Sequence, residues 1–291
     1  MQIVKIKMRF TGIEEPERIY GHRALSFLYG GSLLARLLLP LIAHIPFCSR
    51  FYGWLMRRPS SRVRIAPFID TYRIDTSEFQ TENYSSFNDF FTRKLRPECR
   101  PLAPQGIILP ADGRYLAYPN IAHVPRFHIK GQEFNLETFL DSEAYGRRYA
   151  EGSMVIARLC PTDYHRFHFP LACEAGRSRL INGALFSVNP IALAKRLSIF
   201  WENKRVITEL ESREYGTVLM IEIGATAVGT VQQTYHPGWV EKGQEKGYFE
   251  FGGSCIVLLF EPGRVRLAED LVRNTADGFE TCAQMGQSLI E

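Results

Sequence analysis

The chain contains, near its C-terminus, the run Phe249-Glu250-Phe251-Gly252-Gly253-Ser254-Cys255-Ile256-Val257-Leu258-Leu259-Phe260. Apolar, β-branched and aromatic residues flank a central Gly-Gly-Ser, which predicts a buried strand broken in its middle. Two glycines weaken a strand, so the break indicates a bulge, a bend or a close approach of the backbone. A glycine bulge beside a core strand is one interpretation. The other is chemical, because Gly253 places the least hindered carbonyl directly before the hydroxyl of Ser254.

The composition is that of an ordinary globular protein, and 291 residues suffice for one large domain or two small ones. The net charge of +4 is too small to indicate nucleic acid as a partner, but it is compatible with an anionic membrane surface. The six cysteines include no C-x-x-C pair, and we expect reduced thiols in a protein of the cytoplasmic side. The first residues show no apolar segment typical of a signal peptide.

The most apolar region spans residues 22–47. Its length approaches that of a membrane span, but Arg36 lies near its middle, and Gly30-Gly31, Pro40 and Pro46 interrupt a helix. We therefore predict two short helices in the membrane interface, with apolar side chains in the acyl boundary and arginines facing anionic headgroups. The alternative is an amphipathic helix that packs on the protein's own core.

A further short helix is predicted before Pro97, with Ser86 as its N-cap. The segment ends in a run of basic residues, Arg93, Lys94, Arg96 and Arg100. These side chains could contact a phosphate, or they could form a solvated helix C-terminus that the helix dipole favours.

From residue 105 onward, short apolar runs alternate with Gly, Pro and Asn turns, which indicates a mostly antiparallel sheet. The expected strands are at 106–109, 114–118, 153–159, 179–188, 216–224, 227–235, 249–260 and 263–268, with a short strand within 1–15 and helices at 135–148 and 190–200. The predicted fold class is α+β, with N-terminal membrane-associating helices in residues 1–104 and a β-rich catalytic domain in residues 105–291.

Two further stretches carry polar residues suited to chemistry. Asp112 lies in Pro110-Ala111-Asp112-Gly113, which on its own is typical of a turn. His165 and His168 lie between two prolines, which suggests a single helical turn with both rings on one face. Such a pair could bind zinc, but no further ligands stand at a familiar spacing, so we expect no metal and interpret the histidines as proton carriers.

An aspartate, a histidine and a serine together form a nucleophile system, in which the base takes the serine proton. The residues around Ser254 do not match the G-x-S-x-G pattern of hydrolases, because Ile256 stands where the second glycine is needed. A serine buried in a strand beside Gly-Gly is poorly placed for an external ester, but it is well placed to attack its own preceding peptide bond.

The chain resembles the phosphatidylserine decarboxylases over most of its length. The matching segments, in order, are Ser86-Phe87-Asn88-Asp89-Phe90-Phe91-Thr92-Arg93-Lys94-Leu95, Pro110-Ala111-Asp112-Gly113, Asp163-Tyr164-His165-Arg166-Phe167-His168-Phe169-Pro170, Gly183-Ala184-Leu185-Phe186-Ser187-Val188-Asn189-Pro190, Asn203-Lys204-Arg205-Val206, Val228-Gly229 and Phe251-Gly252-Gly253-Ser254.

The resemblance implies a proenzyme that cleaves itself between Gly253 and Ser254 into a β chain, 1–253, and an α chain, 254–291. Ser254 would become a covalent pyruvoyl group, the only cofactor expected. By the same resemblance, His168 is the base for cleavage, Asp112 orients it, and His165 transfers a proton during decarboxylation.

The implied reaction converts phosphatidylserine to phosphatidylethanolamine through a Schiff base with the pyruvoyl carbonyl, which serves as an electron sink. The resemblance also implies a peripheral or monotopic protein on the cytoplasmic face of a membrane, and a homodimer of α/β-chain heterodimers. One departure is Cys255, where the family commonly has threonine. Two alternatives stay open, namely a relative that decarboxylates a free amino acid and an uncleaved, membrane-associated protein without enzymatic activity.

Overall fold

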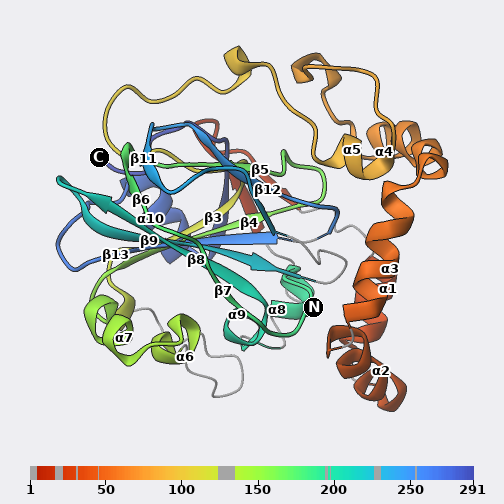
Figure 1. Ribbon diagram of the computed structural model, residues 1–291, viewed down its shortest axis with the longest axis horizontal. Coiled ribbons are helices and arrows are strands. Elements are labelled where there is room, and N and C mark those ends of the chain that lie inside the picture. Colours follow the sequence, from red (N-terminus) through yellow and green to blue (C-terminus); the bar gives the residue numbers. More distant parts are fainter. Residues whose placement is uncertain are drawn as a thin grey trace.

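The computed structural model describes residues 5–16, 22–30, 32–44, 46–123, 135–193, 196, 198–225, 231–252 and 254–291 (Figure 1). Gly253, which supplies the carbonyl of the predicted junction, therefore lies outside the described residues. The side chains of several residues in the N-terminal helices, Arg36 and Cys48 among them, are also not described.

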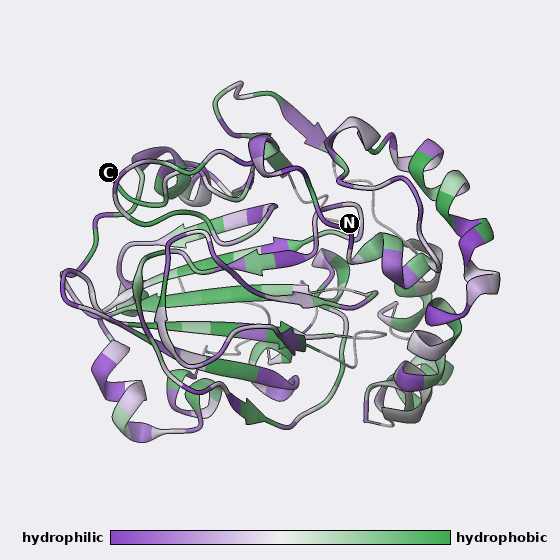
Figure 2. Ribbon diagram, turned by 45° about the horizontal axis from the view of Figure 1, so that its top comes forward, coloured by the Kyte–Doolittle hydropathy of each residue, from purple (hydrophilic) through white to green (hydrophobic). Residues whose placement is uncertain are grey.

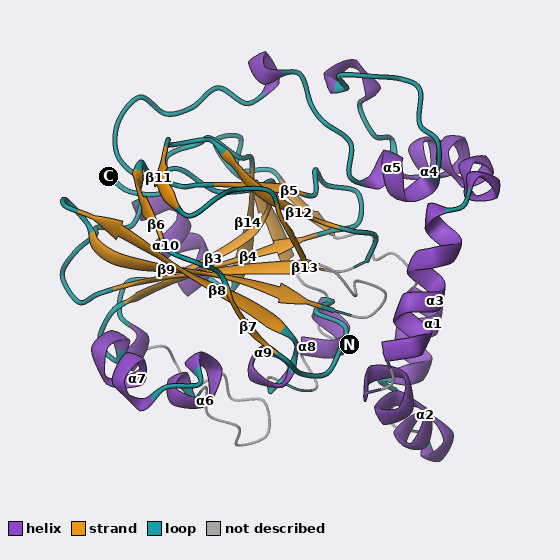
Figure 3. Cartoon of the chain, viewed as in Figure 1, coloured by secondary structure: helices purple, strands orange, loops and turns teal. Residues whose placement is uncertain are grey.

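A large twisted sheet forms the centre of the molecule (Figure 3). Its described strands follow the order β11-β6-β8-β9-β13-β4-β3-β14-β1-β2, and β7 pairs beside β8. The strands are β1 (Lys5–Met8), β2 (Glu14–Pro16), β3 (Gly113–Tyr118), β4 (Ser153–Leu159), β6 (Cys173–Ala175), β7 (Arg179–Ile181), β8 (Arg205–Ser212), β9 (Gly216–Gly224), β11 (Gly238–Val240), β13 (Ser254–Phe260) and β14 (Phe279–Ala283). Only the β1–β14 ladder among them is parallel, which confirms the prediction of a mostly antiparallel sheet.

A small sheet of three described strands packs on one face of the large sheet. Its order is β10-β12-β5, with β5 (Arg166–His168), β10 (Val231–Gln233) and β12 (Glu245–Phe249). The core between the two sheets includes Phe167, Phe249, Ile256 and Leu258, and α10 (Glu269–Ala276) adds Leu271 to it. Alternating residues of β13 therefore enter this core, as the period of two in a strand requires.

Helices cover the other face of the large sheet (Figure 1). They are α6 (Leu136–Leu140), α7 (Glu143–Tyr149), α8 (Pro190–Leu193) and α9 (Ile199–Glu202). Cys255 and Val257 of β13 point into this second core, so β13 is buried on both faces. Figure 2 shows the result as hydrophobic colour along the central strands.

The N-terminal helices stand at one end of the sheet (Figure 1). They are α1 (His22–Leu28), α2 (Leu33–His44), α3 (Pro46–Arg57), α4 (Ile65–Tyr72) and α5 (Phe87–Phe91), joined by the 3-10 turns η1 (Pro59–Arg64) and η2 (Thr76–Glu78). Further 3-10 turns are η3 (Pro97–Cys99) and η4 (Ile121–His123). An aromatic cluster from α3, α4 and α5 packs around Phe251, so this end of the molecule contacts the predicted cleavage junction.

The structure corrects several expectations for the N-terminal half. The apolar region 22–47 forms two short helices, α1 and α2, as predicted, and α3 begins at its end with Pro46, but Pro40 lies inside α2 instead of ending it. Pro40 is exposed, so water can bond the carbonyl that the proline leaves without a donor. Ser86 caps α5 as predicted, because its Oγ accepts from the Asp89 N–H at 3.1 Å.

Corrections in the C-terminal half concern short segments. The predicted strands at 106–109 and 263–268 are isolated bridges, the strand at 179–188 is limited to β7, and the helix at 135–148 is divided at Asp141 into α6 and α7. The prediction for 227–235 is met only by β10, since residues 226–230 lie outside the described residues.

Candidate active site

Ser254 is the first residue of β13, at the point where the chain passes from the small sheet into the large one. It lies opposite Gly224 of β9 and Leu159 of β4. The side chain is fully buried, and its Oγ has no hydrogen-bond partner among the residues that the structure describes. A buried hydroxyl without a partner costs about 1–3 kcal/mol. Such an atom is uncommon in a folded protein, and here it leaves the hydroxyl without a bond that would hold it back from acting as a nucleophile.

The segment before Ser254 is held from both sides. β12 ends at Phe249, and the backbone N–H of Phe251 donates to Asn88 Oδ1 at 3.0 Å. Gly252 has a φ of +147°, which side chains with a Cβ rarely adopt. The first glycine of the Gly-Gly pair is thus required by backbone conformation.

His165 is fully buried and directly precedes β5. Its Nδ1 lies 2.9 Å from the carbonyl of Asp163, and its Nε2 has no partner among the described residues. The Phe91 ring lies against it at a tilt of 38°, with the centroids 3.9 Å apart. A carbonyl only accepts, so Nδ1 carries the proton and Nε2 keeps a free lone pair. Burial lowers the pKa of His165 to about 4, so the ring is neutral near pH 7. Phe91 also packs edge-on against Phe251, which links this histidine to the junction.

His168 lies in β5, opposite Glu245 of β12. The prediction of a helical turn with both histidines on one face is therefore wrong, because residues 166–168 pair as a strand. Phe167 enters the core between the sheets, so alternation turns His168 the other way, toward a cavity of about 390 Å³. Its Nδ1 has no partner, and burial lowers its pKa to about 4.

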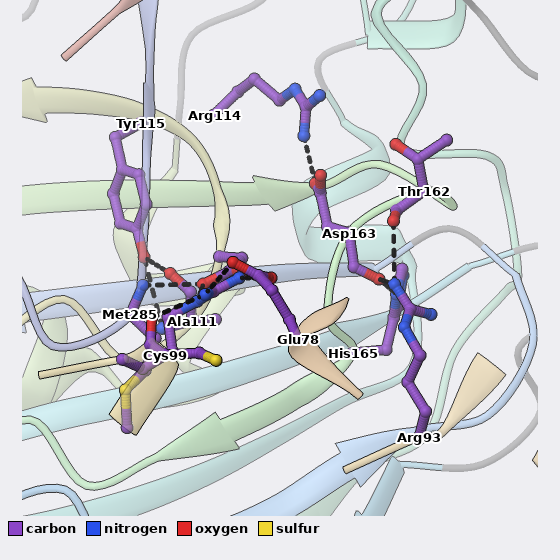
Figure 4. A network of polar contacts seen from close by, with 12 residues as sticks. Glu78, Arg93, Cys99, Ala111, Arg114, Tyr115, Thr162, Asp163, His165 and Met285 are labelled. Carbon is purple, nitrogen blue, oxygen red and sulfur yellow. Dashed lines mark hydrogen bonds and ion pairs between the residues drawn. The ribbon is translucent and has the colours of Figure 1, made fainter. Parts of the chain in front are cut away.

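Asp112 stands immediately before β3 and is almost completely buried. Its carboxylate accepts from Arg100 at 2.9 and 2.6 Å and from the backbone N–H of Met285 at 2.9 Å (Figure 4). Burial raises the pKa of Asp112, and the Arg100 guanidinium opposes that rise. The backbone N–H of His168 donates to the Pro110 carbonyl at 2.8 Å, so β5 runs beside the Asp112 turn.

No hydrogen bond between described residues joins any two of Ser254, His165, His168 and Asp112. The predicted residues instead fall into two groups. His165 lies with the Asp163 segment, and Asp112 lies with Arg100 beside the strand that carries His168.

Sequence reasoning assigned no role to Asp163, although it opens the same matched segment as the histidines. Its carboxylate pairs with Arg114 and accepts from the Cys160 N–H, while its carbonyl accepts from Arg93 at 3.1 Å and from His165 (Figure 4). Arg93 is only 4% exposed, so the interpretation of this residue as part of a solvated helix end is wrong.

Glu222 and Lys246 are a second feature that the sequence did not indicate. Glu222 lies opposite Ile256, two positions along β9 from the partner of Ser254 and on the same face of the sheet. Its carboxylate pairs with Lys246 at 2.9 Å, both side chains are fully buried, and Gln233 bonds to each of them. The mutual pairing compensates both charges inside the core.

Cys255 faces away from Ser254, since neighbouring residues of a strand point to opposite faces. It lies among the apolar residues under the covering helices, opposite Arg158 of β4, and burial raises the pKa of its thiol. The side chain at this position therefore does not contact the nucleophile, and the replacement of threonine by cysteine removes no group from the side of the sheet on which Ser254 lies.

Comparison with known proteins adds the family. A family model described as phosphatidylserine decarboxylase matches residues 87–291. The chain is 45% identical over 286 residues to the phosphatidylserine decarboxylase proenzyme of Chlamydia pneumoniae, covering 97% of this chain and 95% of that protein. It is 46% identical over 287 residues to the proenzyme of the same name from Chlamydia felis (strain Fe/C-56), with the same coverage. The resemblance carried by the motifs is thereby confirmed, and the chain belongs to the phosphatidylserine decarboxylase family.

Proposed function

We propose that this chain is a proenzyme that cleaves itself between Gly253 and Ser254 and then decarboxylates phosphatidylserine to phosphatidylethanolamine. The observation that carries the proposal is the buried, unpartnered Ser254 hydroxyl at the junction of the two sheets, in a member of this family. The curated relatives are named as proenzymes, which agrees with a chain that must be processed.

Self-cleavage begins when Ser254 Oγ attacks the carbonyl carbon of Gly253 and gives its proton to a base. The base returns this proton to the nitrogen of Ser254 as the C–N bond breaks, so that an ester and a free amino group replace the peptide. Removal of the Ser254 α-proton then expels the Gly253 carboxylate and leaves dehydroalanine, whose hydrolysis releases ammonia and forms the pyruvoyl end of the α chain. His168, with its free Nδ1, is proposed as the base, and Asp112 is proposed to orient it.

The pyruvoyl group would supply an electron-withdrawing carbonyl that makes loss of carbon dioxide feasible. The site fits this group, because Ser254 has no competing hydrogen bond and its neighbours on the strand are apolar. His165 is proposed as the proton carrier of the decarboxylation step. Its Nε2 can accept a proton from the substrate ammonium and return it to carbon, while the bond from Nδ1 to Asp163 fixes the ring.

The enzyme activity is tested on the purified wild-type protein by intact mass and by product analysis. We expect two chains, 1–253 and 254–291, in place of one chain of 33.3 kDa, and phosphatidylethanolamine from vesicles that contain phosphatidylserine. A single uncleaved chain in a folded, freshly made sample would sink the proposal. Conversion of soluble amino acids but not of vesicles would assign a different substrate.

The N-terminal helices are proposed to bind the surface of an anionic membrane. They carry a set of exposed apolar side chains, Phe27, Leu33, Leu34, Leu37, Leu41, Phe51, Trp54 and Val63. Arg58 packs over the Trp54 ring at 4.6 Å, which places a cation beside the apolar group. Among the described helices, none has the length and hydropathy needed to cross a bilayer.

A double change of Phe51→Ser and Trp54→Ser should weaken binding to phosphatidylserine vesicles by at least about tenfold, since each large apolar side chain contributes about 1.5–3 kcal/mol when buried. Vesicle sedimentation measures the effect. Trp239→Ser is the matched control, because Trp239 is 65% exposed on β11 at the edge of the large sheet. Equal loss in the control would argue against a membrane face on α3.

Two cations of the basic segment are proposed to face the lipid phosphate. Arg93 and Arg100 are buried or half-buried and bond protein groups. Lys94 and Arg96 are exposed and line the cavity that His168 also lines, although Arg96 Nε donates to the Phe79 carbonyl at 3.2 Å. The choice between a phosphate contact and a solvated helix end thus concerns Lys94 and Arg96. We also propose that the processed heterodimers form a homodimer on the cytoplasmic face of the membrane. The boundary between the N-terminal region and the catalytic domain is proposed to lie at residue 104.

A further inference from the structure

Arg100 bridges two carboxylates that come from distant parts of the chain. Its Nε and one terminal nitrogen bond to Asp112 at 2.9 and 2.6 Å, and its two terminal nitrogens bond to Glu78 at 2.9 Å each (Figure 4). A further bond goes to the Cys99 carbonyl at 2.8 Å. The side chain of Arg100 is 9% exposed, and that of Asp112 is 11% exposed.

These bonds use most of the hydrogen-bond acceptor positions of the Asp112 carboxylate. An ionised carboxylate offers about four lone-pair positions. Arg100 and the Met285 N–H occupy three of them with short bonds, and the fourth receives only a longer contact of 3.1 Å from the Arg100 Nε–H, which both carboxylate oxygens share, so this is the position that another donor can take. β5 runs beside the Asp112 turn, and His168 on β5 has an unpartnered Nδ1. Arg100 thus determines where the remaining lone pair of Asp112 points.

We infer that Arg100 is a positioning residue for self-cleavage, which holds the Asp112 carboxylate ionised and aimed, and that Glu78 in turn holds the Arg100 guanidinium. The inference rests on the proposed function, since it concerns the proposed role of Asp112. It also means that η2, in the N-terminal region, completes the processing site of the catalytic domain.

The Arg100 guanidinium compensates the negative charge of two carboxylates, Asp112 and Glu78. Removal of Arg100 would leave Asp112 buried with a carboxylate neighbour and no cation bonded to it, and a buried carboxyl then takes up a proton. A protonated Asp112 cannot stabilise an imidazolium. The other titratable or charged groups that face Asp112 from the packed elements are Glu78, Arg93, Tyr115, Asp163, Tyr164, His168 and Cys282.

Arginine rather than lysine is required by the same geometry. The planar fork of the guanidinium serves two carboxylates at once, whereas an ammonium is a point charge. Arg100→Lys should therefore keep the charge and lose the orientation. We expect cleavage that is slower by roughly tenfold, with its pH dependence close to that of the wild type.

The test follows cleavage of proenzyme made by cell-free translation and diluted into buffers of different pH. In Arg100→Met, cleavage near pH 7 should fall at least about tenfold, and the acidic limb of the rate profile should move up by about 1–3 pH units. The acidic limb moves up because the ionised form of Asp112 is the active one. A raised pKa removes that form at neutral pH, and higher pH restores it.

Glu78→Gln should shift the acidic limb of the cleavage profile in the opposite direction from Arg100→Met. It deletes a negative charge near Asp112 and leaves the guanidinium to one carboxylate, so the acidic limb should move to lower pH. Arg9→Met is the matched control, because Arg9 is also buried and bonds an aspartate, Asp270, through Nε at 2.7 Å. The pH profile of cleavage in Arg9→Met should keep the midpoint of the wild type.

The inference is overturned if Arg100→Met cleaves at the wild-type rate with an unchanged profile. It is also overturned if Glu78→Gln and Arg100→Met change only the yield of folded protein. Should Arg100→Met fail to fold, Arg100→Lys and Glu78→Gln still test the inference, since both replacements are similar in side-chain volume to the residues that they replace. Absence of cleavage in the wild type would instead contradict the proposed function.

Discussion

Ser254→Ala should leave a single chain of 33.3 kDa with no decarboxylase activity. The substitution removes the only atom proposed to attack the preceding carbonyl, and it also removes the precursor of the pyruvoyl group. The fold should persist, because alanine fits the buried start of β13 and no hydrogen bond is lost with the hydroxyl. Intact mass, circular dichroism and product analysis measure the three consequences.

Ser153→Ala provides the matched control for that variant. Ser153 is also a buried serine at the first position of a central strand, β4, but its Oγ donates to the Pro119 carbonyl at 2.8 Å. We expect normal cleavage and normal activity. Cleavage at the usual place in Ser254→Ala would refute the assigned junction.

His165→Ala should be cleaved and yet decarboxylate about 10²–10⁴ times more slowly, which is the usual contribution of a positioned acid or base. The reason is that the two rings have different proposed roles, His165 in decarboxylation and His168 in cleavage. His165 is fixed through Nδ1 and offers Nε2, whereas His168 lies in β5 near the Asp112 turn. Single-turnover assays on processed protein separate this loss from a loss of processing.

His168→Ala is the complementary experiment and should remain uncleaved. An uncleaved His165→Ala together with a cleaved His168→Ala would mean that the two assignments are exchanged. The buried position of His165 against Phe91, which also packs on Phe251, makes this comparison informative.

The sequence predicted those features that depend on neighbouring residues. Ser86 was identified as an N-cap from its position, and the strands around 114–118, 153–159 and 216–224 follow from apolar runs. The break at Gly-Gly-Ser marks a real boundary. The structure shows that the two halves belong to different sheets, which no local pattern could reveal.

The parts that escaped prediction depend on partners far away in the chain. β5 contains only three residues and is a strand because β12 pairs with it, so the flanking prolines suggested a turn of helix instead. Arg100 appears as one more cation in a basic run, until Asp112 and Glu78 are brought to it. Asp163 belongs to the matched segment, but its pairing with Arg114 and the contact of its carbonyl with His165 exist only once the loop has folded.

The central place of β13 has a consequence for the lifetime of the enzyme. β13 pairs with β9 on one side and β4 on the other, and β14 of the same C-terminal segment lies between β3 and β1. If the bond before Ser254 is cut as proposed, two separate polypeptides share one interleaved sheet. A molecule that unfolds after cutting would have to reassemble from two pieces, one of them only a short fragment. We expect heat or denaturant to inactivate the mature enzyme irreversibly, so that its durability is governed by the rate of unfolding and each chain has a single opportunity to fold.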